Sequence, residues 1–232
     1  MTTLVLLPGM DGTGELFAPF VSALDKRIRT IVIRYPASDP LTYQQLLSRV
    51  REALPKDDPF FLLGESFSGP IAVSIAAEMP EGLQGLILCA SFVRSPMPRL
   101  RFLRSVAGLI SVTSIPERIL SFPLLGRFST RQLCKLLSGT IAQVAPQVFR
   151  VRAREVLNVD VSAAAKQIRI PTLYLQATED KLVGMRATDL VQKHIPHIRV
   201  ARLEAPHMLL QVAHVEAARV VEAFVADLYG TL

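Results

Sequence analysis

The sequence predicts an α/β protein built on an open, mainly parallel sheet. Two observations lead to this prediction: short, continuously apolar segments recur along the chain, and segments with helical spacing lie between most of them. Strands buried on both faces of a parallel sheet are continuously apolar, because helices cover both faces. Strands that alternate with helices are typical of βαβ units. Half of the 232 residues are hydrophobic, which suffices for a core of ordinary size.

Six segments qualify as strands because each is short, apolar and bounded by turn residues. They are Leu4–Leu7, Thr30–Ile33, Phe60–Leu63, Gly85–Cys89, Thr172–Gln176 and Arg199–Leu203. The segments with helical spacing are Glu15–Leu24, Thr42–Leu54, Phe67–Glu78, Met185–His194 and Val212–Leu228. In the last one the predicted packing face consists of Val212, Val215, Ala218, Val221, Val225 and Leu228. We therefore expect six parallel strands with crossover helices on both faces of the sheet.

The alternation breaks between residues 92 and 166, where we find no convincing further strand. This segment has the pattern of several short helices separated by prolines and glycines. We expect it to form a helical cap over one end of a core made of residues 1–91 and 167–232. The chain lacks the run of roughly 18–20 apolar residues that a membrane-spanning helix needs. Its first residues also lack a basic leader, so we expect a soluble, cytoplasmic protein.

The charge is uneven along the chain. There are 26 Lys and Arg residues against 20 Asp and Glu residues, and segment 92–166 alone holds 12 basic and three acidic ones. On a single helix, Arg127, Arg131 and Lys135 would share one face. A solvated surface explains such a basic face as well as a binding site does. Our hypothesis is that the face recruits an acidic acyl-carrier protein or an anionic surface, and we do not expect nucleic acid as a partner.

The segment Phe60–Pro70 carries the most informative motif. An apolar strand ends at Gly64, Ser66 follows two residues later, and a helical segment starts at once. This pattern resembles the nucleophile elbow of the α/β-hydrolase superfamily, Gly-x-Ser-x-Gly, in which a serine occupies a strained turn between strand and helix. Ser68 replaces the final glycine of that pattern and is small enough to fit. The alternative is an ordinary turn between a strand and a helix.

A serine hydroxyl needs a base to take its proton and a third group to orient that base. The resemblance therefore implies an acid and then a histidine farther along the chain, each after a strand. Asp180 follows a predicted strand and has the place of the acid, with Glu179 and Asp160 as competitors. His207 follows the last strand and has the place of the base. The remaining histidines fit structural or surface positions better: His194, His197 and His214.

The same resemblance implies two backbone N–H groups that stabilise an oxyanion. One belongs to the residue after the serine, here Phe67, and by position the other belongs to Met10. The Pro8-Gly9 pair before Met10 resembles some thioesterase-like and acyltransferase-like members. A phosphate-binding loop is not supported, because no Lys-Ser or Lys-Thr pair follows the nearby glycines. The two cysteines lie far apart in the chain, and we expect no metal and no cofactor.

The resemblance implies a serine hydrolase that cleaves small-molecule carboxylic esters through an acyl-enzyme formed with Ser66, His207 and Asp180. Apolar residues of the cap favour an acyl or otherwise apolar substrate. They include Leu109, Ile110, Phe122, Leu124, Leu125, Phe128 and Phe149. Two alternatives stay open. The first is a thioesterase or acyltransferase, or a methyl ester esterase that acts on carrier-protein-linked substrates. The second is a non-catalytic ligand-binding member of the fold.

Overall fold

The computed structural model describes residues 2–56, 58–97 and 117–229. These residues form a six-stranded parallel sheet in the order β2-β1-β3-β4-β5-β6. The strands are β1 (Thr2–Leu7), β2 (Ile28–Val32), β3 (Phe60–Glu65), β4 (Leu83–Cys89), β5 (Thr172–Ala177) and β6 (Arg199–Leu203). This confirms the predicted α/β-hydrolase type of sheet, and the strand boundaries differ from the predicted ones by a residue or two.

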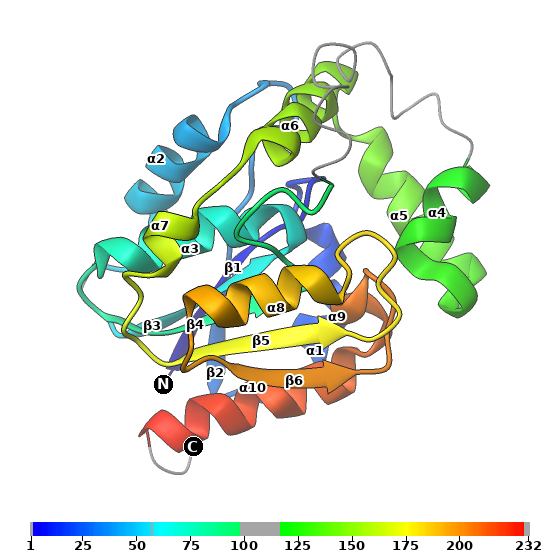
Figure 1. The fold of residues 1–232 in the computed structure, drawn as a ribbon. Coiled ribbons are helices and arrows are strands. Elements are labelled where there is room, and N and C mark those ends of the chain that lie inside the picture. The colour runs from blue at the N-terminus through cyan, green and yellow to red at the C-terminus, as the bar shows by residue number, and fades with distance from the viewer. Residues whose placement is uncertain (1, 57, 98–116, 230–232) are drawn as a thin grey trace.

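Helices cover both faces of the sheet (Figure 1). They are η1 (Glu15–Phe17), α1 (Ala18–Ala23), α2 (Tyr43–Ala53), η2 (Ser66–Ser68), α3 (Gly69–Glu78), α8 (Met185–His194), α9 (Leu209–Val212) and α10 (His214–Tyr229). The predicted face of the last helix is wrong in part, because Val215 and Leu228 are exposed. Non-helical backbone at Ala213 separates α9 from α10, so the spacing does not continue from Val212 into α10.

The two faces of the sheet pack against different helices. Val5 and Leu7 of β1 belong to an apolar cluster with residues of α2, α3 and α8. Leu4 and Leu6 of the same strand belong to a cluster with residues of α1, α9 and α10. All four side chains are fully buried, and each such burial stabilises the fold by roughly 1.5–3 kcal/mol. Alternate residues of one strand therefore serve two cores, which explains why the strands are continuously apolar.

The functional loops follow the carboxyl ends of the strands. The strand order reverses between β1 and β3, so the loops after these two strands diverge and leave a crevice at the switch point. Between β4 and β5 lie α4 (Glu117–Leu125), η6 (Gly126–Phe128), α5 (Arg131–Ala142), α6 (Pro146–Asn158) and α7 (Ser162–Ala165). The described part of this segment adds no strand to the sheet. The helices α4 and α5 lie beyond the carboxyl ends of β5 and β6 (Figure 1).

Residues 98–116 of the predicted cap, including Leu109 and Ile110, lie outside the described residues. Within the described ranges, no helix combines the length and the apolar composition that crossing a bilayer requires.

Candidate active site

Ser66 lies at the turn between β3 and α3, as the first residue of η2. Its φ of 46° is in the left-handed region, which residues other than glycine rarely adopt, so the turn holds the serine in a strained conformation. A Cβ on Gly64 would lie 2.8 Å from the Cβ of Ala72, and one on Gly69 would lie 1.7 Å from Oγ of Ser91. Only glycine therefore allows the strand and the helix to meet this closely. This is the geometry of a nucleophile elbow.

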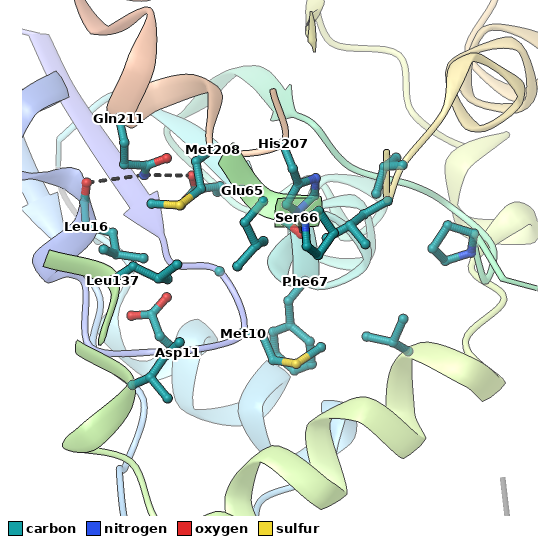
Figure 2. Close-up of a pocket in the computed structure, with 18 of the residues that line it drawn as sticks. Met10, Asp11, Leu16, Glu65, Ser66, Phe67, Leu137, His207, Met208 and Gln211 are labelled. Carbon is teal, nitrogen blue, oxygen red and sulfur yellow. Dashed lines mark hydrogen bonds between the residues drawn. The ribbon is translucent and has the colours of Figure 1, made fainter. Parts of the chain in front are cut away.

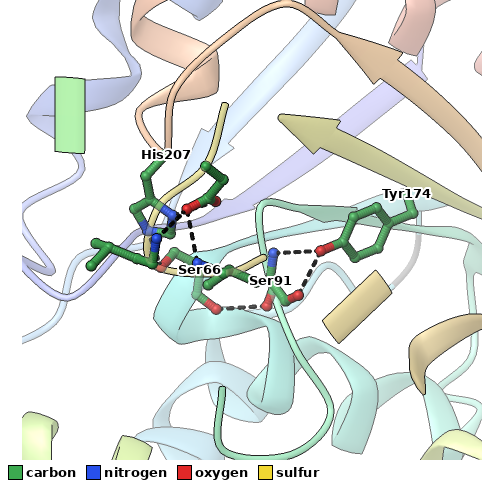
Figure 3. A network of polar contacts seen from close by, with 7 residues as sticks. Ser66, Ser91, Tyr174 and His207 are labelled. Atoms are coloured by element: carbon green, nitrogen blue, oxygen red, sulfur yellow. Dashed lines mark hydrogen bonds and ion pairs between the residues drawn. The ribbon is translucent and has the colours of Figure 1, made fainter. Parts of the chain in front are cut away.

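Ser66 belongs to a continuous hydrogen-bonded chain (Figure 3). Its Oγ lies 2.7 Å from Nε2 of His207, and Nδ1 of His207 lies 2.7 Å from Oδ2 of Asp180. Oδ1 of Asp180 accepts hydrogen bonds of 2.8 Å from the backbone N–H groups of Leu182 and Val183. The Asp180 side chain is only 1% exposed. A carboxylate fixed in this way favours the Nδ1–H tautomer, which leaves Nε2 able to accept the serine proton.

The structure separates the predicted triad from the competing carboxylates. Glu179, the neighbour of Asp180, forms an ion pair with Arg127 at the surface. Asp160, the more distant competitor, forms an ion pair with Arg94. Of the three candidates, Asp180 is the one that faces the imidazole. The directions of the three side chains therefore favour Asp180 as the acid that the sequence predicts.

The loop Pro8–Gly14, called the oxyanion loop below, follows β1. Met10 of this loop and Phe67 both line the cavity that contains Ser66 (Figure 2). Ser68 joins the loop to the elbow, because its Oγ donates to the carbonyl of Pro8 and lies 2.7 Å from the hydroxyl of Tyr35. The small size of Ser68 alone does not predict that its hydroxyl links the loop to the elbow. A hydroxyl in place of the glycine of the elbow pattern was the signal that could have found it.

A second hydroxyl that sequence reasoning missed supports the elbow from the neighbouring strands. Ser91 follows β4, and its Oγ donates a hydrogen bond of 2.6 Å to the carbonyl of Ser66. The Tyr174 hydroxyl on β5 donates to the carbonyl of Ser91 at 2.6 Å and accepts from its N–H at 3.1 Å (Figure 3). Both residues are buried. The strained backbone of Ser66 is thereby held from outside its own turn.

The described residues around Ser66 enclose a cavity of about 300 Å³. This volume lies at the lower end of the range for small-molecule pockets, about 300–1,000 Å³. Most of the wall is apolar, and Leu124 of α4 and Phe149 of α6 contribute to it. Leu125 instead packs against Leu137, and Phe122 is 63% exposed. Only some of the apolar residues that were predicted to form the cap therefore line the cavity.

Besides Ser66 and His207, three polar side chains interrupt the apolar wall: Asp11, Glu65 and Gln211 (Figure 2). Oε1 of Glu65 accepts a hydrogen bond of 3.0 Å from Nε2 of Gln211. Burial raises the pKa of the Glu65 carboxyl from 4.5 to about 7, because the carboxylate loses its hydration, and the Asp11 carboxylate adds to this rise. The cavity thus carries a group that exchanges a proton near neutral pH directly beside the serine in the chain.

The predicted basic face is wrong in one respect: Arg127 does not share a helix with Arg131 and Lys135. Arg127 lies in η6, and α5 begins only at Arg131. Thr130 defines this start, since its Oγ1 accepts a hydrogen bond of 3.2 Å from the N–H of Leu133. Arg131 and Lys135 are exposed on α5.

Besides Arg94, two more arginines of segment 92–166 have partners in the fold. Arg127 forms ion pairs with Glu179 and Glu204, which lie in the loops that carry the triad acid and base. Arg152 of α6 is 0% exposed. The excess of positive charge in segment 92–166 is therefore not simply a solvated surface.

Comparisons with known proteins agree with this geometry. Residues 42–210 match the family described as serine aminopeptidase, S33. Chloroplastic phytyl ester synthase 1 of Arabidopsis thaliana is 36% identical over 107 residues, which cover 42% of this chain and 15% of the plant protein. This chain thus spans a small part of that relative's length.

Two solved structures are similar over nearly the whole chain. The enol-lactonase from Burkholderia xenovorans LB400 superposes with a TM-score of 0.85 at 17% identity, covering 97% of this chain and 91% of the lactonase. The esterase EaEST from Exiguobacterium antarcticum superposes with a TM-score of 0.82 at 16% identity, covering 97% of this chain and 92% of the esterase. At these identities the likeness concerns the fold.

Proposed function

Because the chain belongs to the serine aminopeptidase (S33) family of the α/β-hydrolase superfamily, we propose that it is a serine esterase acting through a covalent acyl-enzyme on Ser66. The observation that carries this proposal is the hydrogen-bonded chain from Ser66 through His207 to Asp180, which opens into an apolar cavity. The cavity size and lining favour a small or medium acyl group, since an apolar wall removes a hydrocarbon chain from water.

The reaction follows from the positions of these groups. Oγ of Ser66 attacks the ester carbonyl carbon while Nε2 of His207 takes the hydroxyl proton, and the carbonyl oxygen becomes an oxyanion. The N–H groups of Met10 and Phe67 bind that oxyanion in our proposal. The carbon–oxygen bond to the alcohol then breaks, and His207 gives its proton to the leaving alcohol. Water attacks the acyl-enzyme in the same way, which releases the acid and restores Ser66.

A second candidate function uses the same acyl-enzyme. The name of the plant relative, an ester synthase, favours transfer of the acyl group to an alcohol in place of water. Both functions need Ser66, His207 and Asp180, so the acceptor distinguishes them. An added alcohol that diverts product from free acid to the new ester would favour acyl transfer.

The proposal is tested with a chain-length series of p-nitrophenyl esters, with thioesters and aminoacyl p-nitroanilides alongside. We expect the esters to be turned over, and kcat of Ser66→Ala to be lower on the order of 10³-fold or more. Ser48→Ala, an exposed serine on α2, is the matched control and should keep full activity. Absence of turnover by the wild type would favour a ligand-binding protein, and full turnover by Ser66→Ala would refute the mechanism. A preference for the anilides would redirect the proposal to amide hydrolysis.

A further inference from the structure

Arg152 is a charged residue in an unusual place. It lies on α6, its side chain is 0% exposed, and no carboxylate forms an ion pair with it among the described residues. Its guanidinium donates instead to three backbone carbonyls, and its Nε has no partner there. Burying a cation opposes folding, and the Asp11 carboxylate offsets this only through its field, without a direct ion pair. Stability alone therefore explains this arginine poorly, and its contacts point to another role.

Two of the three carbonyls belong to the oxyanion loop. Nη1 of Arg152 lies 2.8 Å from the carbonyl oxygen of Met10 and 2.8 Å from that of Asp11, and Nη2 lies 3.0 Å from that of Pro36. The guanidinium thus holds the two peptide planes that follow the N–H of Met10. Fixing these planes restricts the rotation of Met10 about its backbone bonds, and with it the direction of its N–H.

The local sequence makes room for this contact. Gly12 has a φ of +74°, and a Cβ there would lie 2.6 Å from Nη1 of Arg152. The guanidinium carbon also lies 5.6 Å from the ring centroid of Tyr35, whose hydroxyl contacts Ser68. Ser68 in turn donates to the carbonyl of Pro8. The oxyanion loop is therefore held at its start from the elbow and at its middle from α6.

The same helix is also linked, through Tyr43 of α2, to Phe67, the other half of the proposed oxyanion hole. Oε2 of Glu155 accepts a hydrogen bond of 2.7 Å from the N–H of Tyr43, and the hydroxyl of Tyr43 donates at 2.8 Å to the carbonyl of Phe67. Phe149 and Val156 of α6 line the substrate cavity. One helix of the segment 92–166 thus lines the cavity, contacts Met10 directly and reaches Phe67 through Tyr43.

We propose that Arg152 is a positioning residue, which orients the Met10 N–H toward the oxyanion and places a buried positive charge behind it. The inference rests on the proposed serine esterase function. Because this charge lies in a dry environment, it favours the negatively charged transition state over the neutral substrate. The role predicts a loss in kcat with little change in KM.

The test compares Arg152→Met and Arg152→Lys with wild type and with Arg154→Met, an exposed arginine on the same helix. The readouts are kcat per active site, titrated with a phosphonate inhibitor, KM for the best ester, and the affinity for an alkyl boronic acid that mimics the tetrahedral intermediate. We expect Arg152→Met to lower kcat on the order of 10²–10³-fold and to weaken boronate binding by a similar factor. Arg152→Lys should recover part of both, and Arg154→Met should match the wild type.

Unchanged kcat per titrated site and unchanged boronate affinity in both Arg152 variants would overturn the inference, because a purely structural role lowers only the fraction of active protein. If Arg152→Met fails to fold, Arg152→Lys decides, since it keeps the charge but presents fewer donors to the loop. The two proposals fail in different ways. A wild type without turnover would overturn the proposed esterase function. An active wild type with equally active Arg152 variants would overturn only the positioning role of Arg152.

Discussion

Asp180 has contacts that its neighbour in the chain lacks. One of its carboxylate oxygens faces the imidazole of His207, and the other accepts two backbone N–H groups of its own loop. Glu179 points to Arg127 at the surface instead. The loop conformation, rather than the residue type, therefore decides which of the two carboxylates contacts His207.

Replacing Asp180 by asparagine tests whether this carboxylate fixes the tautomer of His207. The amide would donate to Nδ1, which leaves the proton on Nε2 and prevents that nitrogen from accepting the serine proton. We expect kcat for ester hydrolysis to fall on the order of 10³–10⁴-fold in Asp180→Asn. Glu179→Gln is the matched control and should change kcat little. Similar losses in the two variants would contradict the assignment.

We expect Glu65 to make the stability of the protein depend on pH. In the folded protein burial raises the pKa of its carboxyl from 4.5 to about 7. Between these values the unfolded chain has lost this proton and the folded protein still holds it, so stability falls as the pH rises from 4.5 to 7. The loss is about 3 kcal/mol over that range and is complete above the higher pKa.

Glu65→Gln should remove this dependence. We expect the free energy of unfolding, measured by urea titration at pH 5 and pH 8, to differ less between the two conditions in the variant than in the wild type. Glu216→Gln, an exposed change on α10, is the control and should keep the wild-type difference. An identical difference in Glu65→Gln and wild type would show that this carboxyl is not responsible.

At the level of elements, the elbow depends on close approach between β3, α3 and the segment after β4. A Cβ on Gly69 would lie 1.7 Å from Oγ of Ser91, the atom that holds the carbonyl of Ser66. By contrast, a Cβ on Gly139 of α5 would meet no atom within 4 Å. We therefore expect substitution by alanine to have opposite effects on stability at Gly69 and Gly139.

Gly69→Ala should destabilise the protein by about 1–3 kcal/mol, because the added methyl group forces the backbone apart. Gly139→Ala should stabilise it by up to about 1 kcal/mol, since alanine favours the helix. Chemical denaturation of the two variants and the wild type measures both effects. Equal free energies of unfolding for Gly69→Ala and wild type would mean that the elbow is not closely packed.

Most elements were predictable because their signals are local. Continuous apolar runs located the strands, and residue order after each strand located Ser66, Asp180 and His207. The start of α5 was not predicted, because it depends on the capping hydroxyl of Thr130. The roles of Ser68 and Arg152 were also missed, since their partners lie in the loops after β1 and β2 and such contacts carry no periodic signal.

In the molecule as a whole, the apolar pattern of the sequence predicted the sheet and the helices on both of its faces. It did not predict which charged residues of segment 92–166 find partners in the fold. Sequence counts placed the excess of basic residues in segment 92–166. Among the basic residues that the structure describes there, one arginine is buried against carbonyls, one is paired with two glutamates, one is paired with Asp160, and others such as Arg131 and Lys135 are exposed. Counting charges does not reveal which of them find partners in the fold.

Arg131 and Lys135 are exposed, so the carrier-protein hypothesis can be tested at these two residues. We expect the double charge reversal Arg131→Glu and Lys135→Glu to lower kcat/KM for acyl groups linked to an acidic carrier protein on the order of 10-fold at low salt. The activity toward a free p-nitrophenyl ester should stay unchanged, because neither residue lines the cavity. Assays of both substrates at low and high ionic strength check this, and equal effects on the two would reject a carrier site.

Covalent labelling identifies the nucleophile, and we expect it to be Ser66. After reaction with a fluorophosphonate, peptide mass spectrometry should find one adduct per chain, on the peptide that contains Ser66. The labelling should become much slower in His207→Ala, which lacks the base. Labelling of another residue, or stoichiometric labelling that persists in Ser66→Ala, would contradict the account.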